Sequence, residues 1–323
     1  PAPMEDGTTV MNAVIPDRAQ GERLDKVLPS VFPPYSRSQL QLWIRQGRIT
    51  IHGRIPHGRE LVSGGEAVRL EVPRPEPVAW QPQDLPLELV HEDADILVID
   101  KPAGMVVHPG AGNPDGTLAN AVLYHFPELA ALPRAGLVHR IDKDTTGLLV
   151  VARNEHARSK LIRDLERHAV SRCYLAVVDG IPISGGTLDQ PIGRHPRNRL
   201  RMAVNPNGKP AVTHYRVEEK FRAHALISIE LETGRTHQIR VHLSKAGYPL
   251  VGDLLYGRRL HIPAGASAKL AEMLRGFKRQ ALHARSLTLT HPRTGKSLNW
   301  KSPVPPDLTQ LLSTLRSDQR SDP

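Results

Sequence analysis

The chain has 323 residues, of which 39% are hydrophobic and 24% are charged. This length predicts two or more domains, and no apolar run approaches the roughly 20 residues that span a bilayer. A single cysteine, Cys173, excludes an internal disulfide and a thiolate metal cage, and the first 20 residues lack a basic-then-apolar signal pattern. We therefore expect a cytoplasmic protein without a membrane partner.

Positive charge points to the class of partner. The formal net charge is +10, and a basic surface favours polyanions through phosphate contacts and counterion release. The excess is concentrated in two stretches, as expected for a footprint on nucleic acid. Residues 192–222 carry eight Lys or Arg against two Glu, and this group includes Arg194, Arg197, Arg199 and Arg201. Residues 36–54 contain no acidic residue and four arginines, which are Arg37, Arg45, Arg48 and Arg54.

The first part of the chain has the pattern of a small separate domain. Residues 1–17 are predicted to be a flexible lead-in, and residues 18–73 hold a compact pattern. Ser36 is a candidate N-cap for a helix that places Leu40, Trp43 and Ile44 on one face and ends at Gly47. Strands are expected within 48–54 and 64–72. The proline-rich stretch 74–86 is typical of a stiff, extended linker.

Residues 87–305 are expected to form a second, larger domain. The segment 95–109 predicts a strand, a Pro-Gly turn and a second strand, and further strands are predicted within 147–152, 173–180 and 225–234. Helices are predicted over 155–169, with Asn154 as N-cap, and over 236–246, ending at Gly247. Because strands outnumber helices and no βαβ alternation is present, the pattern favours an α+β fold with a largely antiparallel sheet. Residues 306–323 read as a C-terminal tail with one short amphipathic helix.

A group of charged residues, "HRIDKD", stands directly before the apolar segment 147–152. An arbitrary Asp at a strand end is ordinarily a turn cap or an ion-pair partner. Asp142 differs because it has cationic neighbours and the rigid support of a strand. This is the arrangement that a nucleophilic carboxylate needs.

A second cluster lies in "ETGRTHQIRVHL", residues 232–243. His237 and Arg240 are three residues apart on the predicted helix and share a face. A metal site at His237 and His242 is not expected, because five residues separate them and no Glu lies between them. Arg240 is interpreted as a fixed cation that faces Asp142 and keeps its carboxylate ionised against desolvation.

Tyr174 is a third candidate, in the predicted strand "CYLAVVDG". A Tyr on such a strand usually packs in the core. Its functional interpretation is a platform on which a base stacks.

Together these segments resemble the RluA-type pseudouridine synthases. "GLVHRIDKDTTGLLVVA", "VSRCYLAVVDG" and "LETGRTHQIRVHL" are similar to the three motifs of that family, and "LVGDLLYG" and "QALHA" are similar to further family segments. The resemblance covers about residues 85–303, and Ile141 stands where the family usually has Leu. Residues 18–73 resemble the S4 RNA-binding module, through "RLDKVL", "SRSQLQLWIRQGRITIHGR" and "GGEAVRLEV". The resemblance implies a mixed-sheet α+β catalytic domain preceded by a small S4-like α/β domain.

The resemblance also implies an activity, the isomerisation of uridine to pseudouridine in large-subunit (23S) rRNA, in the loop of helix 69. It implies that Asp142 acts as nucleophile or base, that Tyr174 stacks on uracil, and that Arg140 supports base flipping while His139 supports the turn. Arg235 and His237 would contact the substrate together with the two groups of arginines named above. It implies no cofactor and no metal. The expected partner is rRNA or the assembling 50S subunit, with no DNA and no membrane, and the expected state is a monomer.

Three alternatives stay open. The same reaction at other 23S rRNA uridines, as in the C-type synthases of the family, is the nearest. A non-catalytic RNA-binding or ribosome-assembly protein would share the basic stretches and the S4-like module. A metal-dependent hydrolase using the histidines is disfavoured by the lack of clustered Cys or carboxylate ligands.

Overall fold

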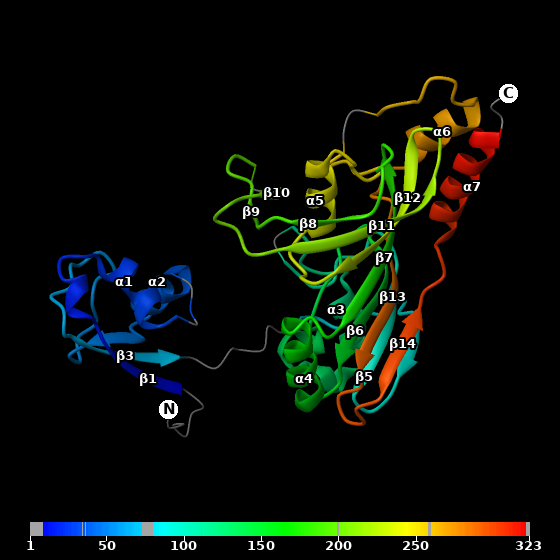
Figure 1. Cartoon of the computed structure of the whole chain (residues 1–323). Coiled ribbons are helices and arrows are strands. Elements are labelled where there is room, and N and C mark those ends of the chain that lie inside the picture. The colour runs from blue at the N-terminus through cyan, green and yellow to red at the C-terminus, as the bar shows by residue number, and fades with distance from the viewer. Residues whose placement is uncertain are drawn as a thin grey trace. The chain divides into compact units, whose positions relative to one another are not determined.

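The computed structural model describes residues 9–33, 35, 37–72, 80–110, 112–198, 200–257 and 260–320. The chain divides into two compact units, residues 1–78 and 79–323, and each has its own hydrophobic core (Figure 1). Among the described residues, no helix combines the length and the apolar character that crossing a bilayer requires.

The N-terminal unit packs helices against an antiparallel sheet. Its described strands lie in the order β1-β3-β2, with bounds Thr9–Val14 for β1, Ile49–Ile51 for β2 and Ala67–Val72 for β3. Its helices are η1 (Asp17–Ala19), α1 (Leu24–Val31) and α2 (Arg37–Arg45). The core joins helix and strand residues, so neither layer is stable without the other.

Helix α2 confirms the expected helix of this unit. Leu40, Trp43 and Ile44 are buried on one face, and Gly47 follows the helix with φ +71°. The predicted N-cap, Ser36, lies outside the described residues.

The prediction of a flexible lead-in over residues 1–17 is wrong for its second part. Residues 9–14 form β1, which pairs with β3 in a register from Thr9 opposite Val72 to Val14 opposite Ala67. Met11 and Ala13 pack on the core of the unit, because alternate residues of an edge strand face the helices. Residues 1–8 lie outside the described residues.

The predicted linker, 74–86, is shorter than expected. Residues 73–79 lie outside the described residues, and residues 80–86 belong to the second unit. The Trp80 ring packs on the core of that unit, the Asn120 amide donates to the Gln81 carbonyl at 2.7 Å, and the Gln83 N–H donates to the Asn120 carbonyl at 3.1 Å. An extended backbone leaves its carbonyls free for such bonds, so a proline-rich composition does not by itself predict a free linker.

The second unit is built on a large mixed sheet. Within the described residues its order is β4-β5-β6-β13-β7-β12-β11-β8, and β14 pairs with β13. The strand bounds are Leu89–Glu92 for β4, Ile96–Lys101 for β5, Thr146–Ala152 for β6, Ser171–Asp179 for β7, Gly186–Asp189 for β8, Val212–Lys220 for β11, His224–Leu231 for β12, Leu282–Thr290 for β13 and Ser297–Lys301 for β14. Strands β6 and β13 run parallel, and the other pairs are antiparallel. This confirms the predicted α+β class with a largely antiparallel sheet.

Helices cover both faces of this sheet. Their bounds are Leu118–His125 for α3, Glu155–Glu166 for α4, Gln238–Ala246 for α5, Ala268–Gly276 for α6 and Pro306–Arg320 for α7, with 3-10 helices η2 (Pro127–Ala131) and η3 (Pro133–Gly136). On β7, Tyr174, Ala176 and Val178 share a core with α3 and α5. The intervening Leu175 and Val177 share a core with α6 and α7. Figure 1 shows α5 on one side of the sheet, and α6 and α7 on the other.

A separate hairpin, β9 (Ile192–Arg194) and β10 (Met202–Val204), carries part of the basic stretch. Ile192 of the hairpin forms a small core cluster with Ala211, Tyr256 and Val241 of α5. The hairpin is therefore attached to the first turns of α5 and to the loop that contains Tyr256.

Two predictions for the second unit are wrong. The second strand expected within 95–109 is absent from the structure, because the Val106 and Val107 carbonyls accept the N–H groups of Leu118 and Ala119 at the start of α3, both at 2.9 Å. The amphipathic helix expected within 306–323 is confirmed as α7, but it is longer than expected and not part of a tail, because its Leu308 and Leu311 are fully buried. The Asn154 N-cap and the stop at Gly247 are confirmed.

Candidate active site

Asp142 lies in the loop that leads from η3 into β6. Its side chain is 14% exposed, and its carbonyl accepts the Thr145 N–H at 3.1 Å. Gly147, at the start of the strand, has φ +108°, and a Cβ there would lie 2.2 Å from the Ala284 carbonyl oxygen of β13. Only glycine allows β6 and β13 to approach this closely, so the sheet itself determines where the loop begins.

A buried lysine holds the backbone of the Asp142 loop. Lys101, at the end of β5, is fully buried, and its Nζ donates to the carbonyls of Pro102, Met105 and Lys143 at 2.7–2.9 Å. Burial lowers the pKa of Lys101 to about 7, although the carboxylates of Asp144 and Asp142 act in the opposite direction. Lys101 thus ties the backbone next to Asp142 to the central sheet.

Arg240 of α5 connects two carboxylates. Its Nη1 donates to Asp142 at 3.0 Å, while its Nε and Nη2 donate to Asp253 at 2.7 and 2.9 Å. Burial acts to lower the pKa of Arg240, but the hydrogen bonds and charges of Asp253 and Asp142 outweigh it and raise that pKa. Burial likewise acts to raise the pKa of Asp253, and the bonds from Arg240 reverse this and lower it. The expected contact between Arg240 and Asp142 is confirmed.

Tyr256 lies next to this ion-pair network. The guanidinium carbon of Arg240 is 4.9 Å from the centre of the Tyr256 ring, and that of Arg201 is 5.2 Å from it. The Tyr256 hydroxyl accepts the Met202 N–H at 2.8 Å and lies 2.7 Å from Nδ1 of His237. Tyr256 therefore joins the basic hairpin, the start of α5 and the Arg240 pair.

A cleft opens over Asp142, and we call it the Asp142 cleft. Tyr174 lines it but is only 6% exposed, and burial raises the pKa of its hydroxyl. Arg172, two residues earlier on β7, also lines the cleft and is 7% exposed, with no hydrogen-bond partner for its Nε among the described residues. The further lining residues include Arg140, Ile141, Thr145, Arg235, His237, Arg240 and Leu282. A carboxylate, a neutral phenol and cations thus meet in one cleft.

Comparison with known proteins identifies the family. The profile of the RNA pseudouridylate synthase family matches residues 95–245. The ribosomal large subunit pseudouridine synthase D of Pseudomonas aeruginosa is 54% identical, with 96% of this chain and 97% of that protein covered. The protein of the same name from Escherichia coli K12 is 49% identical, with 95% of each chain covered. The chain belongs to the RNA pseudouridine synthase family.

Solved structures of relatives agree with this synthase fold. Human RNA pseudouridylate synthase domain containing 4 is 26% identical, with a TM-score of 0.55, and the match covers 71% of this chain and 93% of that one. Human RNA pseudouridylate synthase domain containing 1 is 27% identical, with a TM-score of 0.54, and the match covers 75% and 97% of the two chains. The synthase is therefore an isomerase that acts on RNA.

The structure separates the roles expected of His139 and Arg140. Nε2 of His139 accepts the Val150 N–H of β6 at 3.0 Å, and burial, helped by the nearby Arg172, lowers the pKa of His139 to about 3. The ring is thus neutral and holds the loop against the strand, as expected for support of the turn. Arg140 is exposed at the Asp142 cleft, with no ion pair among the described residues.

His237 is not within the helix, as the sequence predicts, but is its N-cap. It has φ +56°, in the left-handed region, and α5 begins at Gln238. Arg235 lines the cleft, and its Nε donates to the Pro210 carbonyl at 3.0 Å. The sequence pattern could not reveal the N-cap position, because Thr236 is an equally good helix start by residue type.

The predicted RNA-contacting arginines fall into two kinds. Arg54 is bound to Glu60 through two bonds of 3.0 Å, and Arg37 is paired with Asp25 at 2.6 Å. The remaining ones, within the described residues, have no acidic partner: Arg45, Arg48, Arg194, Arg197 and Arg201. Arg199 lies outside the described residues.

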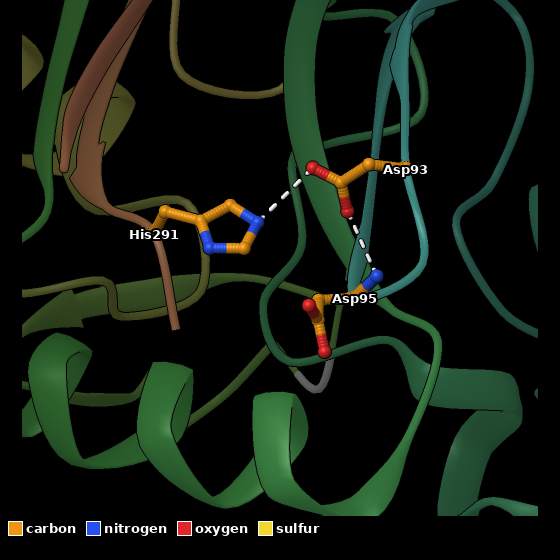
Figure 2. A group of neighbouring side chains, drawn as sticks. All are labelled: Asp93, Asp95 and His291. Carbon is orange, nitrogen blue, oxygen red and sulfur yellow. Dashed lines mark hydrogen bonds and ion pairs between the residues drawn. The ribbon is translucent and has the colours of Figure 1, made fainter. Parts of the chain in front are cut away.

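Two groups of residues have the donor types of a metal site, and the first is the histidine pair His237 and His242. His242 is fully buried, and its nitrogens lie 2.9 Å from the Thr213 hydroxyl and 2.9 Å from the Gln190 carbonyl, so neither points to an open site. Figure 2 shows a second group, Asp93, Asp95 and His291. This one lies at the β4–β5 turn and beside the β13–β14 hairpin, apart from the Asp142 cleft.

The donor atoms of this second group are already engaged. Nδ1 of His291 accepts two backbone N–H groups, at 3.1 and 3.2 Å, so its Nε2 carries the proton that it donates to Asp93 at 3.1 Å. Arg293 donates to both oxygens of Asp95, at 2.7 and 2.6 Å. Protonated and charge-paired atoms are poor metal ligands. The hydrogen bonds of this group instead connect the β4–β5 turn to the β13–β14 hairpin.

Sequence reasoning missed four residues of the site: Lys101, Arg172, Asp253 and Tyr256. Arg172, Asp253 and Tyr256 lie in segments with family resemblance and Lys101 does not, and none was singled out by its local pattern. Only their positions in space, around Asp142 and Arg240, identify them.

Proposed function

We propose that this synthase converts uridine to pseudouridine in large-subunit rRNA, in the loop of helix 69, with Asp142 as the reacting carboxylate. The observation that carries the proposal is the geometry of Asp142: it is partly open to a cleft, and a guanidinium held in place by a second carboxylate contacts one of its oxygens. The names of the bacterial relatives support the choice of rRNA as substrate.

The reaction is an isomerisation. The bond between C1′ and N1 of the uridine breaks, a bond between C1′ and C5 forms, the C5 proton leaves, and N1 gains a proton. Asp142 serves this in one of two ways: its carboxylate attacks C1′ and is later displaced by C5, or it removes a ribose proton to give a glycal. Both use a carboxylate oxygen that faces the ribose, and Arg240 fixes the orientation of Asp142 by holding one of its oxygens at 3.0 Å.

The other cleft residues have roles that follow from their positions. Tyr174 supplies an apolar face with a protonated hydroxyl, suited to stacking on uracil. The target nucleotide must leave its stack to reach Asp142, at a cost of a few kcal/mol that is lower in a loop. Arg140 is exposed beside Asp142 and is placed to hold the displaced nucleotide, while the exposed Arg194 and Arg197 bind phosphates.

The test is site mapping of pseudouridine. Purified protein and its Asp142→Asn variant are each incubated with unmodified 23S rRNA and with 50S subunits, followed by carbodiimide labelling and primer extension. We expect stops in the helix 69 loop that the variant loses by more than about a thousandfold in rate while RNA affinity changes little. Stops elsewhere would move the substrate to other 23S uridines, as for a C-type synthase, and an active variant would overturn the role of Asp142.

We also propose that the N-terminal unit binds RNA through Arg45 and Arg48. Both lie at or beside α2 and have no acidic partner among the described residues. In contrast, Arg54 already donates both arms to Glu60. Each phosphate contact that is lost should lower the slope of log affinity against log salt by about one.

Binding measurements over a range of salt concentrations test this proposal. The Arg45→Gln/Arg48→Gln variant should weaken rRNA binding and lower the salt slope by about two, and Arg54→Gln, the matched control, by clearly less. Equal effects of the two variants would contradict the assignment.

A further inference from the structure

The orientation and protonation of the His237 ring are determined by its neighbours. His237 is the N-cap of α5, lines the Asp142 cleft, and has its Nδ1 2.7 Å from the Tyr256 hydroxyl. A neutral imidazole carries one proton, and the partner of one nitrogen decides which nitrogen carries it. The hydrogen bonds of Tyr256 therefore decide what His237 offers to the cleft.

The Tyr256 hydroxyl has one proton to donate, and its oxygen can also accept hydrogen bonds. Its oxygen accepts the Met202 N–H at 2.8 Å. Its proton then needs an acceptor, and within the described residues the only one in reach is Nδ1 of His237. Tyr256 is 5% exposed and burial raises its pKa, so the hydroxyl keeps its proton. Nδ1 is thus an acceptor, and Nε2 carries the hydrogen.

Nε2 of His237 has no hydrogen-bond partner among the described residues. The buried polar atoms without a partner in this part of the chain are Nδ1 of His139, Nε of Arg172, Nε of Arg201 and Nδ1 of His224. Nε2 of His237 is not one of them, so solvent reaches it. Because His237 lines the same cleft as Asp142 and Tyr174, this N–H is available to a bound nucleotide.

Burial keeps the His237 ring neutral. Burial lowers the pKa of His237, and the cations of Arg240 and Arg140 act in the same direction, against the carboxylates of Asp142 and Asp253. A cationic ring could not accept the Tyr256 hydroxyl proton, which would then lack an acceptor among the described residues. An uncharged donor matches an uncharged acceptor, whereas phosphates are better matched by the exposed guanidinium groups nearby.

We propose that His237 presents Nε2–H to a carbonyl oxygen of the flipped uracil, and that Tyr256 is the positioning residue that selects this tautomer. The inference rests on the proposed assignment of Asp142 as the reacting carboxylate. It adds a residue that orients the base in the cleft, and it explains why the basic hairpin, through the Met202 backbone, is joined to the start of α5.

Two substitutions of His237 separate donor chemistry from backbone preference. The amide nitrogen of a glutamine occupies roughly the place of Nε2, and that of an asparagine the place of Nδ1. His237 has φ +56°, a conformation that asparagine tolerates better than glutamine, so His237→Asn should fold at least as stably as His237→Gln. Activity should show the opposite order.

We expect His237→Gln to lose about tenfold in kcat/KM, and His237→Asn about a hundredfold, because the uracil carbonyl then has no donor. Thermal unfolding of both variants supplies the stability order. Equal activities, or a more active His237→Asn, would overturn the inference. The Asp142→Asn variant is assayed beside them: if it is active, the proposed function fails, and if it is inert, the order at His237 tests this inference alone.

Nuclear magnetic resonance gives a readout that does not depend on turnover. In protein labelled with ¹⁵N-histidine, two-bond ¹⁵N–¹H correlations report which ring nitrogen carries the proton, and His237→Gln identifies the signal among the 16 histidines. We expect an Nε2–H ring, and in Tyr256→Phe, which keeps the ring beside Arg240, a loss of that preference. An Nδ1–H ring in the unaltered protein would refute the proposal.

Salt dependence tests whether His237 instead binds a phosphate as a cation. His237→Gln should leave the slope of log affinity against log salt unchanged, since a neutral ring on a carbonyl oxygen releases no counterion. A slope lowered by about 0.7, as for one charge on a single-strand phosphate, would show a cationic ring and overturn both the neutral tautomer and the assignment to uracil.

Discussion

The Arg240 guanidinium donates hydrogen bonds to two carboxylates that differ in solvent exposure. Asp253 is fully buried and takes the paired Nε and Nη2 side, which leaves Nη1 for Asp142. A two-bond pair with Arg240 would occupy both oxygens of Asp142. By taking that geometry itself, Asp253 leaves one oxygen of Asp142 outside the guanidinium contact, as the proposed reaction with the ribose requires.

Asp253→Asn should therefore impair the chemistry rather than RNA binding. With only an amide beside it, Arg240 can turn toward Asp142, and kcat should fall at least about tenfold while KM changes little. Single-turnover rates on rRNA measure this. Asp95→Asn is the matched control, since Asp95 also takes two bonds from an arginine, at 2.7 and 2.6 Å, but lies outside the cleft. An equal loss of rate in the control would contradict this explanation.

Asp93 makes folding stability depend on pH. Burial acts to raise its pKa, but hydrogen bonds from His91, from the backbone of Asp95 and Ile96, and from His291 outweigh this and lower it to about 2. Because the folded pKa lies below the unfolded value of 3.8, the contribution is complete above about pH 4 and is lost as pH falls toward 2.

Asp93→Asn should thus lower the free energy of unfolding by roughly 1–2 kcal/mol at pH 7 and by less at pH 3. Urea unfolding at pH 7, 5, 4 and 3 measures the difference between the two proteins. A difference that is constant over this range would show that Asp93 does not act through its charge.

At the scale of elements, the contact between β6 and β13 determines where the Asp142 loop starts. The two strands pair in parallel through His283 with Thr146 and Ala284 with Gly147, and the Thr146 hydroxyl lies 2.9 Å from Nδ1 of His283. A Cβ at position 147 would meet the Ala284 backbone at 2.2 Å, which no side-chain motion relieves.

Gly147→Ala should cost more than about 3 kcal/mol in stability and abolish turnover, because backbone strain and strand separation add. Gly295→Ala is the control: Gly295 also has a positive φ, +69°, but nothing lies within 4 Å of the position that a Cβ would take, so strain alone should cost about 1 kcal/mol. Chemical denaturation and turnover are measured for both. Equal costs would mean that the close approach of the strands is unimportant.

At the scale of the whole molecule, two units with separate cores predict separable functions. Residues 79–323 contain the Asp142 cleft and all the elements that support it. Without residues 1–78, the fragment should unfold cooperatively and form pseudouridine at saturating RNA, with a KM raised about tenfold or more by lost phosphate contacts. A fragment that is folded but inert at saturating RNA would contradict this modular view.

Much of this arrangement could be predicted from the sequence, where the cause is local. The helix predicted over 155–169 and its Asn154 cap depend on period and capping alone, and both are confirmed, with the helix ending at Glu166. The contact of Arg240 with Asp142 was predicted from charge and family resemblance.

The features that the sequence did not predict depend on contacts between residues that are distant along the chain. Val106 and Val107 are as apolar as any strand, but their carbonyls are taken by α3, a helix that the sequence pattern did not predict. Asp253 contacts Arg240 only because the chain around Gly252 folds back on α5, which the sequence pattern does not show. Residues 9–14 became part of a sheet because β3, almost 60 residues later, offers a free edge.

The position of β13 has a consequence for biosynthesis. This strand lies between β6 and β7, yet it is among the last to be translated, and it joins a half that carries Asp142 to a half that carries Tyr174 and Arg240. While the nascent chain ends before Leu282, the two halves have no strand between them, and closing such a long-range contact is slow. The Asp142 cleft therefore forms only near the completion of translation, so an incomplete chain on the ribosome lacks this cleft while rRNA surrounds it.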